Sequence, residues 1–230
     1  MLKNLVNNYL DIELSDKQVK LFDLYYEKLV SYNEHTNLTR ITSKFDAQVK
    51  HFLDSMYLGR LLDFNKPLNL CDMGAGAGFP SIPLLILYPN LKVTIVESQI
   101  KRVQFLKELK QVLELDFNIE HKRAENFALE SIEKFDIVTA RALGELKLIL
   151  EFGVPMLKVG GYFIAPKGSK YQEELDDALN AMKVLNIKLI EIDKFELPND
   201  SGFRANLLLK KEKHVSGYPR QFAIIKKKPL

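Results

Sequence analysis

The amino-acid sequence predicts an α/β protein with a seven-stranded, mostly parallel sheet, an antiparallel last strand and a helical N-terminal extension. Three observations support this fold class. Apolar residues recur at helical spacing in the first 66 residues, short apolar segments alternate with longer amphipathic ones after Pro67, and a glycine-rich segment follows the first predicted strand. Strands that alternate with helices indicate βαβ units, which build parallel sheets.

The N-terminal extension, residues 1–66, is predicted to be helical and to pack on the rest of the protein. Ser15 and Gln18 have the spacing of a capping box, and apolar residues recur at helical intervals behind them. Residues 32–42 are polar and predict a loop, whereas residues 46–62 resume a helical pattern.

Residues 67–230 are predicted to form one α/β domain with a basic C-terminal tail. The predicted strands are residues 68–73, 92–97, 118–123, 135–141, 161–167, 188–193 and 205–211, and the predicted helices are residues 80–87, 99–114, 144–157 and 170–185. The last two strands are joined by a segment too short for a parallel crossover, so we expect the final strand to be antiparallel. Seven strands with the last one reversed is the layout of the Rossmann-like class I methyltransferase fold.

Composition excludes several classes of protein. Of the 230 residues, 47% are hydrophobic and 27% are charged, which permits a large core and excludes a disordered or fibrous chain. One cysteine cannot form an internal disulfide or a thiolate metal cage. No segment has the apolar length of a signal peptide or of a ~20-residue membrane span. We therefore expect a soluble, cytoplasmic protein.

Positive charge is concentrated at the C-terminal end of the chain. The net charge is +3, but residues 204–230 contain eight basic side chains and one acidic side chain, which leaves −4 on residues 1–203. A basic end on a mildly acidic body indicates an anionic polymer as partner. A basic tail that only increases solubility explains the same charges.

A glycine-rich segment, DMGAGAGFP at residues 72–80, joins the first predicted strand to the next helix. Glycines let the backbone turn tightly and bring N–H groups to a ligand at the positive end of the helix dipole. A dinucleotide fingerprint would have its third glycine at position 79, where this chain has Phe79, and no Gly-Lys-Ser/Thr of a Walker loop follows. The segment predicts either a ligand without a pyrophosphate or a tight turn without any ligand.

An acidic residue at the end of the second predicted strand favours a nucleoside ligand. Glu97 lies 19 residues after Gly78, and a carboxylate at this point can accept hydrogen bonds from both hydroxyls of a ribose. A carboxylate there can also merely complement the dipole of the following helix. S-adenosylmethionine has a ribose and an adenine but no phosphate, so it agrees with Gly74 and Gly76 of the loop and with Glu97.

Two further strand ends are predicted to line the same crevice, because ligands of open α/β sheets bind beyond the carboxyl ends of the strands. Ala124 and Glu125 follow the third strand, where they can meet an adenine edge. Arg141 ends the fourth strand, where the transferred group usually lies. Alternatively, Arg141 pairs with Glu145 on the protein surface.

The sequence resembles the bacterial RsmG family, also called glucose-inhibited division protein B, over nearly the whole chain. The resemblance is carried by NLT (37–39), HFLDS (51–55), DMGAGAGFPSIPL (72–84), VES (96–98), RAE (123–125), ARA (140–142), PKG (166–168) and KPL (228–230). The HxxDS segment, the GxGxGFP loop and the ARA segment in this order are specific. Ser81 departs from the glycine common in the family, but we expect it inside the helix, where it leaves the cofactor assignment unchanged.

The resemblance implies an enzyme that uses S-adenosylmethionine to methylate N7 of a guanosine in 16S, small-subunit ribosomal RNA. The cofactor contacts that it implies are Gly74, Phe79, Ala124, Glu125 and Arg141, and the ribose argument adds Glu97. The implied partner is small-subunit ribosomal RNA or the 30S particle, without membrane contact, and we expect a monomer.

The residues present agree with an N7 acceptor without identifying one. Guanine N7 has a free lone pair at neutral pH, so we expect no general base and no nucleophile, and we expect Arg141 to position the reactants. Cys71 lies inside a predicted strand and is expected to be a core thiol. No metal is expected, because His51 and Asp54 are better explained by helix packing or pocket lining than by metal binding.

RNA contacts are expected from basic side chains nearer the pocket and in the tail, namely Arg102, Lys167, Arg204, Arg220, Lys226, Lys227 and Lys228. Phe79 or Tyr218 is a candidate to stack on a splayed base. Other functions stay open at this point. They are methylation of another RNA, a small molecule or a protein, a non-catalytic RNA-binding module, and a nicotinamide-dependent dehydrogenase, which the missing third glycine disfavours.

Overall fold

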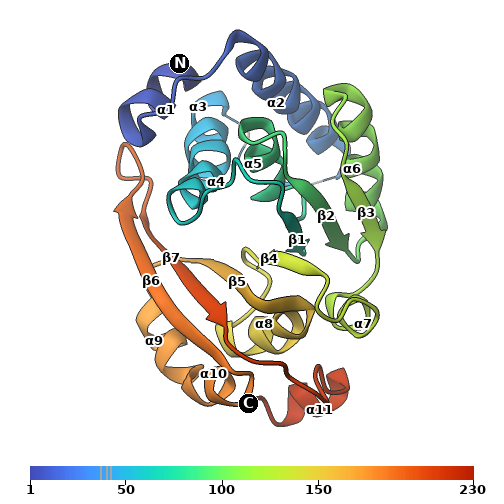
Figure 1. Ribbon diagram of the computed structural model, residues 1–230. Coiled ribbons are helices and arrows are strands. Elements are labelled where there is room, and N and C mark those ends of the chain that lie inside the picture. Colours follow the sequence, from blue (N-terminus) through green and yellow to red (C-terminus); the bar gives the residue numbers. More distant parts are fainter. Residues whose placement is uncertain (37, 40, 42) are drawn as a thin grey trace.

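A seven-stranded sheet forms the centre of the protein, which a computed structural model describes over residues 1–36, 38–39, 41 and 43–230 (Figure 1). The strands are β1 (Asn69–Met73), β2 (Lys92–Glu97), β3 (Asn118–His121), β4 (Phe135–Thr139), β5 (Leu157–Lys167), β6 (Ile187–Glu196) and β7 (Phe203–Lys211). Their order in the sheet is β3-β2-β1-β4-β5-β7-β6. Strand β7 is antiparallel to both of its neighbours and the other pairings are parallel, so the predicted sheet with a reversed last strand is confirmed.

The parallel register brings the carboxyl ends of four strands to one edge of the sheet. Met73 of β1 lies beside Val96 of β2, and Asp72 lies beside Thr139 of β4. Glu97 at the end of β2 lies beside His121 at the end of β3. The segments that follow β1, β2, β3 and β4 therefore leave the sheet close to one another.

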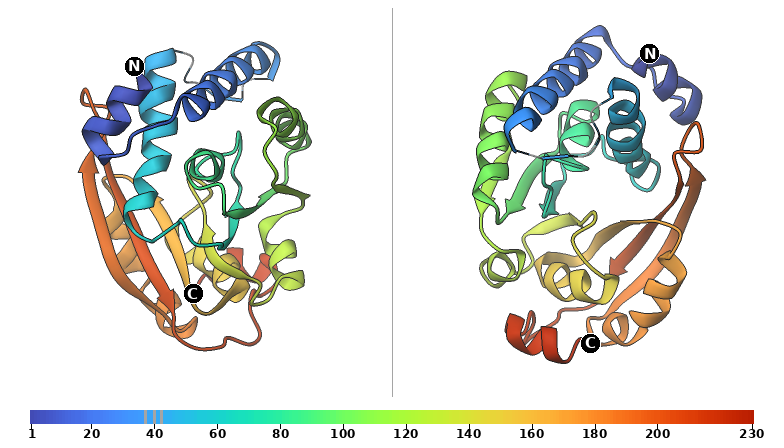
Figure 2. Two further views of the ribbon diagram at one scale, coloured as in Figure 1. Left: turned by 45° about the horizontal axis from the view of Figure 1, so that its top comes forward. Right: turned by 180° about the vertical axis from the view of Figure 1, so that it is seen from behind.

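Helices cover both faces of the sheet (Figure 2). Buried apolar residues of α5 (Ser81–Leu87) and α6 (Ile100–Leu113) form one hydrophobic cluster with residues of β1 and β2. The cluster on the other face is formed with α7 (Ala124–Glu130), α8 (Leu146–Gly153), α9 (Tyr171–Asp177) and α10 (Leu179–Val184), and it includes the buried thiol of Cys71. In the described part of the chain, no helix is long and apolar enough to cross a membrane.

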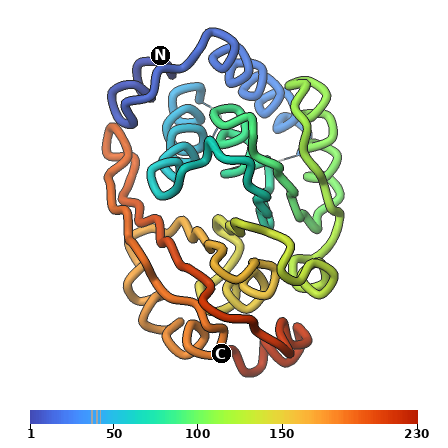
Figure 3. The backbone as a smooth tube through the Cα atoms, in the orientation of Figure 1, coloured from blue at the N-terminus to red at the C-terminus, as the bar shows by residue number. Residues whose placement is uncertain are grey.

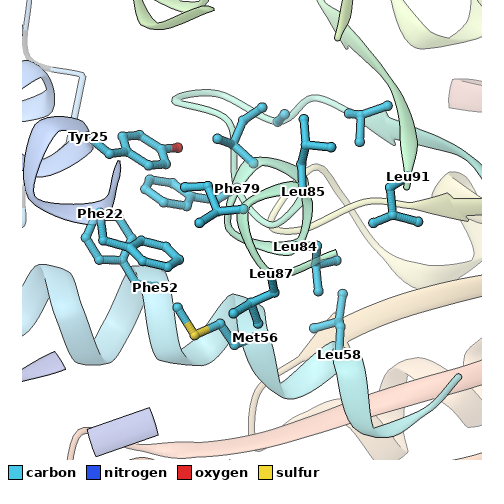
Figure 4. Packing of buried hydrophobic residues seen from close by; sticks show 14 of the residues in the cluster. Phe22, Tyr25, Phe52, Met56, Leu58, Phe79, Leu84, Leu85, Leu87 and Leu91 are labelled. Carbon is cyan, nitrogen blue, oxygen red and sulfur yellow. The ribbon is translucent and has the colours of Figure 1, made fainter. Parts of the chain in front are cut away.

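The N-terminal helices add a further layer on the α5 side of the sheet. They are α1 (Leu2–Leu10), α2 (Asp16–Thr36) and a helical segment made of α3 (Lys44–Ala47), a π-helix (Gln48–Leu53), α4 (Asp54–Met56) and a 3₁₀ turn (Tyr57–Arg60). Phe22 and Tyr25 of α2 pack with Phe52 and with residues of α5 in the same cluster (Figure 4). The predicted capping box is confirmed, because Gln18 N–H donates to Ser15 Oγ at 3.3 Å and Ser15 N–H donates to Gln18 Oε1 at 2.9 Å.

Several predicted boundaries were wrong because tertiary packing overrode the local pattern. Helix α2 continues to Thr36 instead of ending before Tyr32, since the Tyr32 ring packs on Phe105 of α6 at 5.1 Å. Strands β3 and β4 end at His121 and Thr139, two residues earlier than predicted, and β5 begins four residues earlier than predicted. Helix α7 was not predicted, and the helix predicted over residues 170–185 divides at Ala178. Asn37 and residues 40 and 42 of the predicted loop lie outside the described residues.

The basic C-terminal segment is folded onto the domain, at the opposite end of the molecule from the N-terminus (Figure 3). Lys211 is fully buried, and its Nζ donates to Leu157 O at 2.7 Å and to Glu133 Oε1 at 3.1 Å. Arg220 pairs with Glu151, and α11 (Phe222–Lys227) follows. With Arg204, which pairs with Asp54, at least three of the eight basic side chains in residues 204–230 therefore pair with carboxylates of the domain, which the sequence pattern does not reveal.

We predict that Arg220→Ala destabilises the protein by about 3–5 kcal/mol, because it leaves a buried carboxylate without its partner. Glu151 is fully buried, and it accepts from Arg220 Nε and Nη2, both at 2.7 Å. Equilibrium denaturation in urea measures the change. The double variant Glu151→Leu/Arg220→Leu should recover much of the loss, and an Arg220→Ala variant as stable as the wild type would show that the pair contributes nothing.

Candidate functional site

The glycine loop between β1 and α5 has the backbone conformation that its sequence predicts. Gly74 and Gly76 have φ angles of +69° and +61°, which side chains with a Cβ rarely adopt. The Gly74 N–H donates to Val96 O at 2.7 Å, so the loop starts against the end of β2. A Cβ built on Gly76 would meet only the Arg102 side chain, 4.0 Å away. The loop therefore starts against the sheet and leaves open space beside the Gly76 Cα.

Asp72, at the end of β1, holds the start of α5 beneath this loop. Its Oδ2 accepts from the Ser81 N–H at 3.1 Å, and Ser81 lies in the first turn of α5, as predicted. The carboxyl is fully buried, and this burial raises its pKa to about 7, against the opposing effect of the bond from Ser81. Asp72 is thus a structural carboxyl behind the loop.

Three aromatic rings meet beside the loop. The Phe79 ring stacks with the Tyr25 ring at 5.2 Å (Figure 4) and with the His51 imidazole at 4.5 Å, and the Arg141 guanidinium lies 5.1 Å from its centroid. Phe79 is only 5% exposed. It therefore has no free face for a splayed base, and the predicted stacking role of Phe79 is wrong.

His51 is held neutral in this arrangement. Burial and the nearby charge of Arg141 lower the pKa of His51 to about 3. Its Nε2 lies 3.0 Å from Thr39 Oγ1, while Nδ1 is buried without a partner among the described residues. His51 therefore lines the site without adding positive charge.

A first pocket of about 190 Å³ lies against the glycine loop. Its walls include four predicted cofactor residues, which are Gly74, Gly76, Phe79 and Arg141, together with Thr39, His51 and Arg102. His51 was predicted to line a pocket, and Arg102 was expected near the pocket as an RNA contact, whereas Thr39 was not predicted as a site residue. The structure therefore brings part of the predicted set together around one cavity and adds an N-terminal wall.

The remaining predicted cofactor residues, Glu97, Ala124 and Glu125, are not among the lining residues of this pocket. Glu97 is 2% exposed, and its carboxylate accepts from Gly76 N–H at 3.1 Å and from Gln99 N–H at 2.9 Å, with Arg102 Nη1 3.6 Å away. Ala124 and Glu125 begin α7 after β3, where Glu125 is buried and pairs with Arg123. The partly exposed Arg102 side chain thus lies beside the buried carboxylate that is predicted to bind a ribose.

A second pocket of about 450 Å³ adjoins the first and shares His51, Arg141 and Ala142 with it. Its charged lining residues are the basic Lys50, Arg141, Lys167 and Arg204 and the acidic Asp54 and Glu174. The prediction that His51 and Asp54 line a pocket is confirmed. With four basic and two acidic side chains, this cavity favours an anionic ligand.

Arg141 enters the shared wall from the end of β4 and pairs with a distant carboxylate. Its Nη1 lies 3.3 Å from Asp54 Oδ2, and Arg204 Nε lies 3.2 Å from both oxygens of the same carboxylate. Glu145 pairs with Lys147 instead, at 3.4 Å. The alternative of a surface pair between Arg141 and Glu145 is therefore wrong.

The residues predicted to contact RNA occupy different environments. Lys167 and Arg204 line the second pocket, where Lys167 Nζ also donates to Glu174 Oε2 at 2.6 Å. Arg220 is engaged by Glu151. Lys226, Lys227 and Lys228 are exposed on and just after α11, which reaches α7 through the Phe222 ring, 4.8 Å from the Arg123 guanidinium.

Comparisons with known proteins agree with this geometry. Residues 18–201 match the GidB family, described as rRNA small subunit methyltransferase G. A ribosomal RNA small subunit methyltransferase G from Acholeplasma laidlawii is 70% identical over 230 residues, which is 100% of both chains.

Two solved structures share the fold at low sequence identity. One is a precorrin-6y C5,15-methyltransferase from Geobacter metallireducens, with a TM-score of 0.52 and 16% identity over 69% of this chain and 87% of that one. The other is TYW2 from M. jannaschii in complex with AdoMet, with a TM-score of 0.52 and 16% identity over 69% and 76% of the two chains. The predicted methyltransferase fold is confirmed. Because the sequence match extends over more than half of the chain, this protein belongs to the rRNA small subunit methyltransferase G (GidB) family.

Proposed function

We propose that this protein uses S-adenosylmethionine to methylate N7 of a guanosine in 16S ribosomal RNA. The observation that carries the proposal is the pair of adjoining pockets, one against the glycine loop and one with basic walls, that share His51, Arg141 and Ala142. A methyl donor in the first and a nucleotide in the second would meet at this shared wall. Family membership supports ribosomal RNA as the substrate class, and the N7 position rests on the family alone.

The first pocket, together with predicted residues outside its lining, fits S-adenosylmethionine. Gly76 has room above its Cα, and Glu97 offers a buried carboxylate that can accept hydroxyl hydrogens once the Arg102 guanidinium moves aside. Ala124 and Glu125 at the start of α7 are proposed to border the adenine. When bound, S-adenosylmethionine supplies an activated methyl group on a sulfonium.

The chain itself has mainly to orient the reactants, because guanine N7 has a free lone pair and needs no base. His51 is neutral and therefore adds no positive charge beside a sulfonium. Arg141 is held in the shared wall by Asp54, and its planar guanidinium can hold either the methionine carboxylate or the guanine O6. Both roles orient a reactant without transferring a proton.

RNA binding is proposed to start in the second pocket and to continue along exposed basic residues. Lys167 and Arg204 line that pocket and are placed to meet phosphates of a nucleotide inserted there. Lys226, Lys227 and Lys228 extend the positive surface, and Tyr218 is kept as a candidate to stack on a base. Because Arg220 neutralises Glu151, we propose that it contributes least to RNA affinity.

Methylation of small ribosomal subunits by the purified protein tests the function directly, with mass mapping of the modified nucleotide. We predict that Arg141→Lys lowers turnover by about 100-fold or more with little loss of stability, because lysine keeps the charge and loses the planar fork. Glu145→Gln is the matched control and should keep full activity. Wild-type turnover by Arg141→Lys would remove Arg141 from the active crevice, and methylation at a position other than guanine N7 would refute the proposed acceptor.

We predict that Glu97→Gln weakens S-adenosylmethionine binding by roughly 1–3 kcal/mol, since an amide has only one accepting oxygen and no charge. Calorimetric titration measures the affinity. Glu120→Gln, on the adjacent strand β3, is the control and should bind like the wild type. Equal affinities for all three proteins would show that the ribose lies elsewhere.

Replacing Lys226, Lys227 and Lys228 by alanine should weaken RNA binding while sparing S-adenosylmethionine affinity. Each lost phosphate contact should lower the slope of log affinity against log salt by roughly 0.7–0.9. Substitution is preferable to truncation, because Leu230 packs against the hydrophobic core. The double variant Lys188→Ala/Lys194→Ala on β6 controls for charge. Lost cofactor binding with unchanged RNA affinity would instead mean that the tail serves the cofactor pocket.

A further inference from the structure

Tyr25 connects the N-terminal helix α2 to the glycine loop. We propose that Tyr25 is a positioning residue for the methyl donor, so that the N-terminal extension is a working part of the cofactor site. The inference rests on the proposed function only for the identity of the ligand. Nothing about Tyr25 was indicated by the sequence, where it is one of several apolar positions of a helix.

The contact between Tyr25 and the loop is both polar and apolar. The Tyr25 hydroxyl donates to Ala77 O at 2.5 Å, and the ring stacks on Phe79 with an angle of 9° between the ring planes. Tyr25 is fully buried, so its hydroxyl has no access to water as an alternative partner. Ala77 and Phe79 are themselves lining residues of the first pocket. Tyr25 therefore contacts two residues that line the pocket, Ala77 by a hydrogen bond and Phe79 by ring stacking.

The packing around the Tyr25 hydroxyl leaves no room for a side chain at Gly78. A Cβ built on Gly78 would lie 2.8 Å from the Tyr25 oxygen, and Gly78 has a φ angle of +96°. Gly78 thus lies where the Tyr25 hydroxyl of α2 meets the loop. This glycine is needed for the approach of a helix from the extension as well as for the turn itself.

The same aromatic contacts reach the shared wall of the two pockets. The Phe79 ring stacks on the His51 ring with 4.5 Å between their centroids, and the Arg141 guanidinium lies 5.1 Å from the Phe79 centroid. A shift of Phe79 therefore moves the residues that both pockets share. Through this contact, Tyr25 influences where the acceptor meets the donor as well as how tightly the donor binds.

A pre-ordered loop increases affinity, because the ligand does not have to order the backbone when it binds. Without the hydroxyl, the Ala77 carbonyl loses its buried donor and the loop becomes free to sample other conformations. The expected consequence is weaker binding of S-adenosylmethionine by a protein that is still folded. A merely structural tyrosine would lower stability and leave the affinity of the folded protein unchanged.

Two variants of the same helix control for stability. Tyr32→Phe also removes a hydroxyl of α2, which donates to Lys101 O of α6 at 3.1 Å, but it leaves the glycine loop unchanged. Phe22→Leu reduces packing against Phe52, which lies at a ring distance of 5.0 Å, and so lowers stability without removing a loop contact. Together they separate loop ordering from general weakening of the α2 layer.

The experiment is calorimetric titration of S-adenosylmethionine into the full-length wild type and into Tyr25→Phe, Tyr32→Phe and Phe22→Leu, with urea denaturation of each. We expect Tyr25→Phe to bind about 5- to 20-fold more weakly and both controls to stay within about twofold of the wild type. Hydrogen exchange of the amides of residues 74–79 should be faster in Tyr25→Phe and unchanged in Phe22→Leu.

The outcomes distinguish this inference from the proposed function. Wild-type affinity in Tyr25→Phe, with or without lower stability, overturns the positioning role and leaves the proposed function intact. Equal weakening in Tyr25→Phe and Phe22→Leu also overturns it, because affinity would then follow stability. A wild-type protein that does not bind S-adenosylmethionine refutes the proposed function and this inference together.

Discussion

The acceptor side of the site depends on one carboxylate, that of Asp54. It pairs with Arg141, which lies 87 positions away in the chain, and with Arg204, which lies 150 positions away. Two guanidinium groups so close together repel each other, and a carboxylate between them offsets that repulsion. The three residues keep one net positive charge in the wall of the second pocket. Because Asp54 comes from the N-terminal helices, Arg141 from the end of β4 and Arg204 from β7, this wall exists only when all three parts of the chain are assembled.

The fold could be predicted from the sequence where the pattern is local. Alternating apolar runs predicted the seven strands, and the short connection before residues 205–211 predicted the reversed one. The glycine loop and its helix start were predicted for the same reason, since the required residues are consecutive. Helix α7 was missed because its seven residues are too few to show a helical period, and the last turn of α2 was missed because its sequence is polar.

The site could be predicted only in part, because much of it depends on contacts between distant residues. Sequence spacing suggested Glu145, four positions away, as an alternative partner of Arg141, whereas the actual partner is Asp54. Nothing in the pattern around Tyr25 indicated that its hydroxyl reaches Ala77, 52 positions away. The number of basic residues in the C-terminal segment also overstates its free positive charge. Lys211 forms an ion pair with Glu133, and Arg220 forms one with Glu151. The position of these acidic partners, elsewhere in the chain, was the missing information.

The position of β7 between β5 and β6 has a consequence for how the protein can fail. In the described sheet β6 is hydrogen-bonded to β7 alone, and β7 also covers the edge of β5. A chain that stops before Phe203, through a premature stop codon or proteolysis, leaves both of these strands with open backbone edges. Open edges of this kind pair with other chains and promote aggregation. Early truncation should therefore remove the protein from the cell as aggregate or as a substrate of proteases, and the α/β domain completes its sheet only after residue 211 has left the ribosome.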